Sequence, residues 1–146
     1  MNKNIRTILI VIIGLLALIT VVGFIYGLQN KIKTNDIYAS YDETILDAVD
    51  TSIKVCQGAF NSVGATEDEM VNLNDYITNI NEAESPVLKA YIADSMLTYT
   101  GDFVMVLSQN YAVGIESRAA NFTGIQEKLV TAKSKLSAAR NYGSDK

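Results

Sequence analysis

Hydrophobic residues along the chain form one continuous run near the N-terminus, followed by a longer region in which they recur at intervals. No charged residue occurs between positions 7 and 30, and 15 of the 21 residues at 8–28 are Leu, Ile, Val or Phe. As a helix this run is about 31 Å long, which matches the hydrocarbon thickness of a bilayer. The pattern predicts a transmembrane helix over 8–28 after a short tail over 1–7. The expected membrane-anchor residues are Ile8, Leu9, Ile12, Leu16, Ile19, Val22, Ile25 and Leu28.

A cleaved signal peptide is the alternative interpretation of this run. Its apolar part usually has about 7–15 residues and ends at a small-residue cleavage site. Here the run is longer and ends in Phe24-Ile25-Tyr26, so we expect an anchor that is not removed. Two basic residues precede the run and two follow it, and the terminal amine then favours a cytoplasmic N-terminus. The expected location is the bacterial cytoplasmic membrane, with a single pass and the bulk of the chain outside the cytoplasm.

The spaced apolar residues behind the anchor have helical periodicity. They recur every three or four positions, and strict two-residue alternation is missing. We expect a juxtamembrane linker over 29–35 and a helical-bundle domain over 36–146. The predicted helices cover about 36–63, 66–82, 86–113 and 119–142. Narrow apolar stripes of this kind need partners, as in coiled coils. The expected fold class is therefore all-α, with an N-terminal transmembrane helix followed by an antiparallel four-helix bundle.

The stripes name the residues expected in the core. The first helix contributes Ile45, Val49, Ser52, Cys56, Ala59 and Val63. The short second helix contributes Met70, Leu73, Ile77 and Ile80. The third contributes Ile92, Met96, Tyr99, Phe103, Val106, Asn110 and Val113. The last contributes Phe122, Ile125, Leu129, Ala132, Leu136 and Ala139.

Local sequence signals support these helix boundaries. Ser85 before Pro86 is typical of an N-cap followed by proline at the first helical position. Thr66 and Glu69 have the spacing of a capping box. Gly64 is placed to end the preceding helix in a left-handed conformation, and Gly114 and Gly143 mark two further stops.

The composition excludes several kinds of chemistry. The chain has no His, so imidazole bases and His metal ligands are excluded, and its single Cys excludes an internal disulfide. The net charge of −4 argues against nucleic-acid binding, which needs an excess of cations. We therefore expect no enzyme activity, no catalytic residue, no cofactor, no metal and no small-molecule substrate.

Charge is distributed unevenly along the chain. Residues 31–117 have a net charge of −10, whereas residues 118–146 have a net charge of +4. The first interpretation is that the basic last helix packs beside acidic earlier helices through solvated ion pairs. The alternative is an acidic surface that binds a basic partner. The candidate interaction surface comprises Asp42, Glu43, Asp47, Asp50 and Tyr91.

Three strings in the C-terminal half resemble the LemA family of bacterial membrane proteins. They are LSQNY at 107–111, NFTGIQEKL at 121–129 and AARNY at 138–142. Ala112 stands where that family usually has proline, and residues 41–49 lack its Arg pair, so any relative is divergent, of host or phage origin. The resemblance implies one membrane helix and a four-helix bundle, and it brings no catalytic residues.

Three kinds of function follow from an anchor joined to a bundle. The first is a non-enzymatic scaffold or assembly module that contacts the lipid bilayer and either protein partners or further copies of itself. The second is a phage lysis protein or another envelope-spanning protein. The third is a ligand-sensing four-helix domain.

Overall fold

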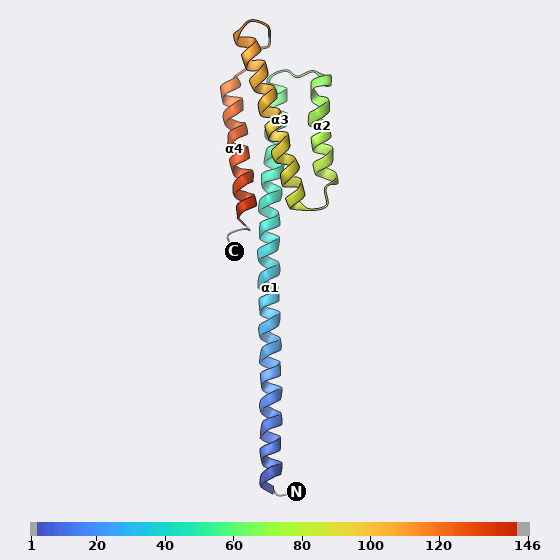
Figure 1. The fold of residues 1–146 in the computed structure, drawn as a ribbon, viewed down its shortest axis with the longest axis vertical. Helices are drawn as coiled ribbons and strands as arrows, with labels where there is room; N and C mark the ends of the chain where they lie inside the picture. Colours follow the sequence, from blue (N-terminus) through green and yellow to red (C-terminus); the bar gives the residue numbers. More distant parts are fainter. Residues whose placement is uncertain (1–2, 143–146) are drawn as a thin grey trace. The chain divides into compact units, whose positions relative to one another are not determined.

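The computed structural model describes the backbone of residues 3–142 and the side chains of residues 8–26 and 41–142. Within the described backbone it contains helices and no strand, which confirms the all-α class (Figure 1). The helices are α1 (Lys3–Ser62), α2 (Glu67–Glu82), α3 (Pro86–Ala112) and α4 (Phe122–Asn141). The chain forms two compact units, Met1–Ala39 and Ser40–Lys146.

Helix α1 contributes to both units. It continues through 29–35, where we expected a linker, so the domain does not begin with a separate helix at 36. The physical reason is that residues 29–40 contain neither glycine nor proline, the residues that most often end a helix.

The core of the second unit is built from side chains of all four helices. The stripes predicted for the first and last helices are confirmed, because their members are buried apart from the half-buried Phe122. In α2, Leu73 and Ile80 are buried, whereas Met70 and Ile77 are half-buried against the core. The largest fully buried side chain is Phe60, which the stripe pattern missed because it lies beside Ala59 on a wider apolar face.

An aromatic stack joins α1 to α3 and α2. The ring of Phe60 lies 4.5 Å from that of Phe103, with an angle of 6° between their planes. Tyr99 lies 6.2 Å from Phe60 and 5.7 Å from Tyr76, measured between ring centroids. The Tyr99 hydroxyl accepts a hydrogen bond from the Asn72 amide at 3.3 Å, so the ring is packed while its polar end reaches the surface.

The stripe predicted for α3 was confirmed only in part. The buried residues of this helix are Ala90, Ala93, Met96, Leu97, Thr100, Val104 and Leu107, and only Met96 was expected. Val106 and Val113, which were expected in the core, are 49% and 70% exposed. Helix α3 is apolar on two adjacent faces: the first carries these buried residues, and the second carries Ile92, Tyr99 and Phe103 of the predicted stripe, which are half-buried and packed against the core. The second face packs against α2, which has 16 residues against 27 in α3, and the last turns of α3 extend beyond it (Figure 1).

The helix ends follow the predicted capping chemistry with one exception. The capping box of Thr66 and Glu69 and the N-cap Ser85 are confirmed. Gly64 and Gly114 have φ angles of 64° and 77°, which confirms the two left-handed stops. Gly143 lies outside the described residues. Helix α4 begins at Phe122 rather than at 119, because the Asn121 side chain accepts a hydrogen bond from the Gly124 amide and caps the helix there.

Side-chain contacts fix how α1 lies beside α4. The Tyr41 hydroxyl donates to the Arg140 carbonyl at 3.1 Å, and the Lys135 ammonium contacts the Asp47 carboxylate at 2.6 Å. Just after α1, the Gly64 carbonyl accepts a hydrogen bond at 3.4 Å from the guanidinium of Arg118, which precedes α4. Residues that come later in the first segment therefore contact residues that come earlier in the last segment.

We expect the Phe60→Ala substitution to lower the free energy of unfolding by about 3–5 kcal/mol, because it leaves a cavity where three aromatic rings meet. The measurement is urea unfolding of the full chain in detergent micelles. Unfolding is monitored by the alkylation of Cys56, the single thiol of the chain. The matched control is Val130→Ala at a residue that is 69% exposed, where a change within about 0.5 kcal/mol is expected. A loss below about 1 kcal/mol for Phe60→Ala would contradict the central role of this ring.

Candidate functional site

The apolar segment of α1 is exposed around its whole circumference. Ile8–Tyr26 has 19 residues and a mean hydropathy of 3.2, and none of it is buried against other parts of the structure. It is the one helix among the described residues that is long and apolar enough to cross a membrane. Seven of the expected anchor residues are 49–63% exposed, and the side chain of the eighth, Leu28, lies outside the described residues. An apolar surface of this extent is unfavourable in water and suits a lipid environment.

The four acidic residues of the candidate interaction surface do not converge on one point. Asp47 binds Lys135 on α4, and Asp50 binds Lys54 one turn along α1, each at 2.6 Å. Hydrogen bonding from the Lys135 ammonium lowers the pKa of Asp47. Asp42 is half-buried and Glu43 is exposed. Among the described residues no group of three or more potential metal-binding side chains occurs.

Tyr91 lies at the contact between α3 and α4. The residue is 55% exposed, and the Arg140 guanidinium carbon lies 4.0 Å from the centroid of its ring. This is the geometry of a cation–π contact, which at an exposed site contributes about 0.5–1 kcal/mol. Tyr91 therefore has an intramolecular partner on one face of its ring.

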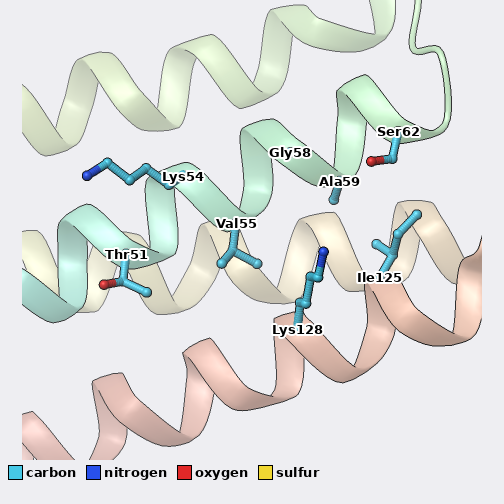
Figure 2. A pocket seen from close by; sticks show the side chains of 8 residues that line it. All are labelled: Thr51, Lys54, Val55, Gly58, Ala59, Ser62, Ile125 and Lys128. Atoms are coloured by element: carbon cyan, nitrogen blue, oxygen red, sulfur yellow. The ribbon is translucent and has the colours of Figure 1, made fainter.

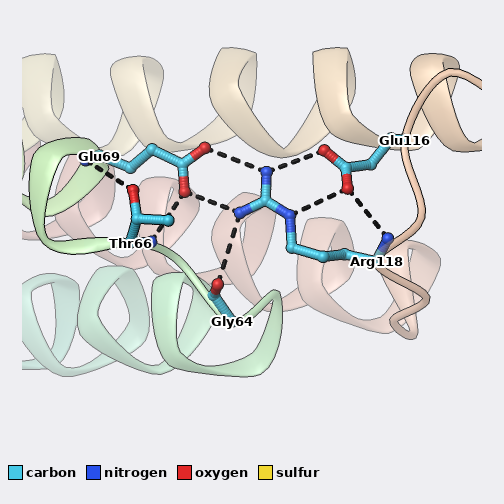
Figure 3. A network of polar contacts seen from close by, with 5 residues as sticks. All are labelled: Gly64, Thr66, Glu69, Glu116 and Arg118. Carbon is cyan, nitrogen blue, oxygen red and sulfur yellow. Dashed lines mark hydrogen bonds and ion pairs between the residues drawn. The ribbon is translucent and has the colours of Figure 1, made fainter.

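The most extensive polar network in the described residues centres on Arg118, which sequence reasoning did not single out (Figure 3). Its guanidinium binds both Glu69 oxygens, at 2.7 and 3.0 Å. It also binds both Glu116 oxygens, at 2.8 and 3.1 Å, and reaches the Gly64 carbonyl at 3.4 Å. We call Gly64, Glu69, Glu116 and Arg118 the Arg118 clasp. It joins the α1–α2 turn, the first turn of α2 and the α3–α4 loop.

The single guanidinium and the two carboxylates of the clasp give it a net charge of −1 and shift one another's pKa values. The Arg118 guanidinium and its backbone N–H lower the pKa of Glu116 to about 2. Hydrogen bonds from the Arg118 side chain and then from the Thr66 backbone lower the pKa of Glu69. Both carboxylates raise the pKa of Arg118. All five guanidinium N–H groups are used within the clasp, so it serves to hold segments together and has no donor left for a ligand.

A groove lies between α1 and α4 (Figure 2). Its volume is about 310 Å³, and the residues that line it are Thr51, Lys54, Val55, Gly58, Ala59, Ser62, Ile125 and Lys128. Gly58 and Ala59 leave room on the α1 side, and the Lys128 side chain extends from α4 toward α1. The groove has the size and mainly apolar lining to hold a small apolar group.

Cys56 is buried in the core, as expected for a small hydrophobic residue. Desolvation raises the pKa of its thiol to about 11. The thiolate form that a nucleophile requires is therefore scarce at neutral pH.

Comparisons with protein-family models, with curated proteins and with solved structures find no match to this chain.

We expect Arg118→Ala to lower the free energy of unfolding at pH 7 by about 1–2 kcal/mol, because hydrogen bonds to charged groups are lost at a site about one-quarter exposed. The control is Lys54→Ala, which breaks an exposed pair within α1 and is expected to have little effect. The measurement is urea unfolding in micelles at several pH values.

The effect of Arg118→Ala depends on pH in a defined direction. The folded-state pKa values of Glu69 and Glu116 lie below the ordinary value of 4.5, so the clasp stabilises the fold fully above that pH. Its contribution is lost as the pH falls toward about 2, where Glu116 becomes protonated. The difference between wild type and variant is therefore expected to shrink between pH 4.5 and 2. An equal difference across that range would show that the clasp carboxylates are not responsible.

Proposed function

We propose that this protein is a single-pass membrane protein whose helical domain serves as a non-enzymatic scaffold or assembly module. The observation that carries the proposal is the unburied apolar helix Ile8–Tyr26 in a chain whose other unit has its own closed core. The proposed location is the bacterial cytoplasmic membrane, with the domain outside the cytoplasm. The proposed partners are the lipid bilayer and either other proteins or further copies of the chain.

We propose that the domain is an antiparallel four-helix bundle. Three observations support this arrangement. All four helices share one core, and α3 packs against both α2 and α4. Residues later in α1 contact residues earlier in α4. The strings at 107–111, 121–129 and 138–142 that resemble the LemA family lie in α3, α4 and their ends, and they support the same arrangement.

A second candidate function is ligand sensing, which the groove between α1 and α4 favours. Its volume of about 310 Å³ is at the lower end of ligand pockets. A ligand held there would contact both helices, and binding would stabilise the domain by mass action. A thermal-shift screen of small apolar compounds, with Gly58→Leu as the variant that fills the groove, separates this function from scaffolding. A ligand that stabilises the wild type but not Gly58→Leu would support sensing.

We expect Leu16→Lys combined with Ile19→Lys to release the protein from membranes. Each lysine near the centre of a membrane helix raises the free energy of insertion by about 2.5–3.5 kcal/mol. Two lysines together approach the total free energy that favours insertion of this helix. The measurement is the fraction retained in the membrane pellet after carbonate extraction. The control adds the same two charges at exposed sites of the domain, Val71→Lys with Val130→Lys, and should stay in the pellet.

The scaffold role predicts defined neighbours in the membrane. We expect chemical crosslinking of the full chain in intact membranes to give discrete larger species. We also expect protease to digest the domain when it is added to spheroplasts but not when it is added to intact cells. Recovery of uncomplexed monomer alone at every crosslinker concentration would argue against scaffolding. Protection of the domain in spheroplasts would place it in the cytoplasm instead.

A further inference from the structure

The groove between α1 and α4 holds a positive charge that has no partner within the domain. The Lys128 side chain extends across the groove from α4 toward α1 (Figure 2). Among the described residues, no hydrogen bond or ion pair engages its ammonium group. The other basic residue of the lining, Lys54, is bound to Asp50 at 2.6 Å, and no carboxylate is part of the lining.

This charge is opposite in sign to that of the unit that contains the groove. Residues 40–146 contain 15 acidic and 8 basic side chains. At the groove, Lys54 and Lys135 are each balanced by one carboxylate of α1. Glu127 precedes Lys128 in α4, but adjacent residues of a helix do not face each other, and Glu127 is not part of the lining. The groove therefore has a local excess of one positive charge.

The walls of the groove are apolar. Ala59 and Ile125 are buried residues that line it, and Val55 between α1 and α4 is half-buried. The alkyl stem of Lys128 adds further methylene surface. A small anion such as acetate would cover little of this surface, whereas an anion with an apolar body would remove it from water. The groove thus combines one cation with an apolar floor.

Gly58 keeps the α1 side of the groove open. A Cβ at this position would meet no atom within 4 Å, and Gly58 is not one of the glycines with positive φ. Neither close packing nor backbone conformation requires glycine here, and alanine would favour the helix. The effect of glycine at this position is therefore to leave space between the two helices.

The dimensions of the groove favour a single extended chain. Its volume is about 310 Å³, which at roughly 30 Å³ per water-sized atom holds about ten non-hydrogen atoms. Its lining runs along α1 from Thr51 to Ser62, a distance of about 16 Å. A membrane phospholipid with two long acyl chains is too large for this space.

We propose that the groove binds a free medium-chain monocarboxylate. The carboxylate is bound by the Lys128 ammonium, and the chain lies against Val55, Ala59 and Ile125. A single unpaired ammonium matches a single negative charge, so a phosphate or a dicarboxylate would hold a second charge without a partner. The proposal rests on the ligand-sensing candidate function, and it names the class of ligand.

Three probes separate the contributions of charge and chain. They are octanoate, which has ten non-hydrogen atoms, its neutral analogue octanamide, and acetate. The full chain in detergent micelles is heated with each probe, and the unfolding midpoint is read by pulsed alkylation of Cys56, which is buried in the folded domain. We expect octanoate to raise the midpoint more than octanamide does, and acetate to leave it unchanged, because a ligand stabilises the state that binds it.

A pair of lysine variants tests the role of Lys128. We expect Lys128→Met to weaken octanoate binding about tenfold, because it removes a charge-assisted contact that is partly open to solvent, and to leave octanamide binding unchanged. The control is Lys133→Met, which removes the same charge from α4 at a residue near Asp94 and outside the lining. Octanoate affinity, taken from the dose dependence of the midpoint, should stay at the wild-type value in the control.

Two variants of Gly58 test whether the groove is the binding site. We expect Gly58→Leu to fill the groove and abolish the effect of both eight-carbon probes. Gly58→Ala is the milder change, which keeps the test valid if the leucine variant does not fold. It should raise the midpoint of the unliganded protein by a few degrees and lower its affinity for octanoate.

Other outcomes overturn the proposal. An equal loss of octanoate binding in Lys128→Met and Lys133→Met would show a general effect of charge. Stabilisation by octanoate that persists in both Gly58 variants would show binding elsewhere. Octanamide that stabilises the wild type as well as octanoate does would leave ligand sensing supported and the carboxylate class wrong. If no compound of a wider screen stabilises the wild type, ligand sensing fails as well, whereas crosslinking and carbonate extraction still test the scaffold and its anchor.

Discussion

The contact between Phe60 and Phe103 holds α1 against α3, and the other helices are arranged around it. Phe60 is fully buried near the end of α1, and Tyr99 extends the stack toward Tyr76 of α2. Because three helices meet at these rings, the position of α2 against α1 and α3 depends on them. An α1 without this contact would have only its stripe of smaller residues, such as Ala59 and Cys56, to pack against α3.

The core residues were predicted better for helices with one apolar face than for α3, which has two. The stripes of α1 and α4 were correct because each of these helices buries one face. Helix α3 packs two adjacent apolar faces, so periodicity selected the half-buried face with Tyr99 and Phe103 and missed most of the fully buried one. The unequal lengths of α2 and α3 were predicted from the helix boundaries, and the exposure of Val113 follows from that length difference.

Polar contacts were likewise predictable from the sequence where they are local and unpredictable where they are long-range. Local pairs were predictable, since the capping box of Thr66 and Glu69 depends on residues three apart. The Arg118 clasp was not, because Glu69 is 49 residues from Arg118 and its second partner, Glu116, lies in an irregular loop. The uneven charge along the chain has a partial explanation in the pair of Asp47 with Lys135, which joins α1 to α4 across the unit.

Two left-handed glycines, Gly64 and Gly114, occur at the same end of the unit as Arg118. A Cβ at either position would meet no atom within 4 Å, so any penalty there is conformational, of about 1–2 kcal/mol per residue. Both glycines and the clasp restrict which amino acids this end accepts, whereas the turn between α2 and α3 has no residue with positive φ. Substitutions in related sequences should accordingly accumulate slowly at the end with the two glycines and the clasp, and faster at the turn between α2 and α3.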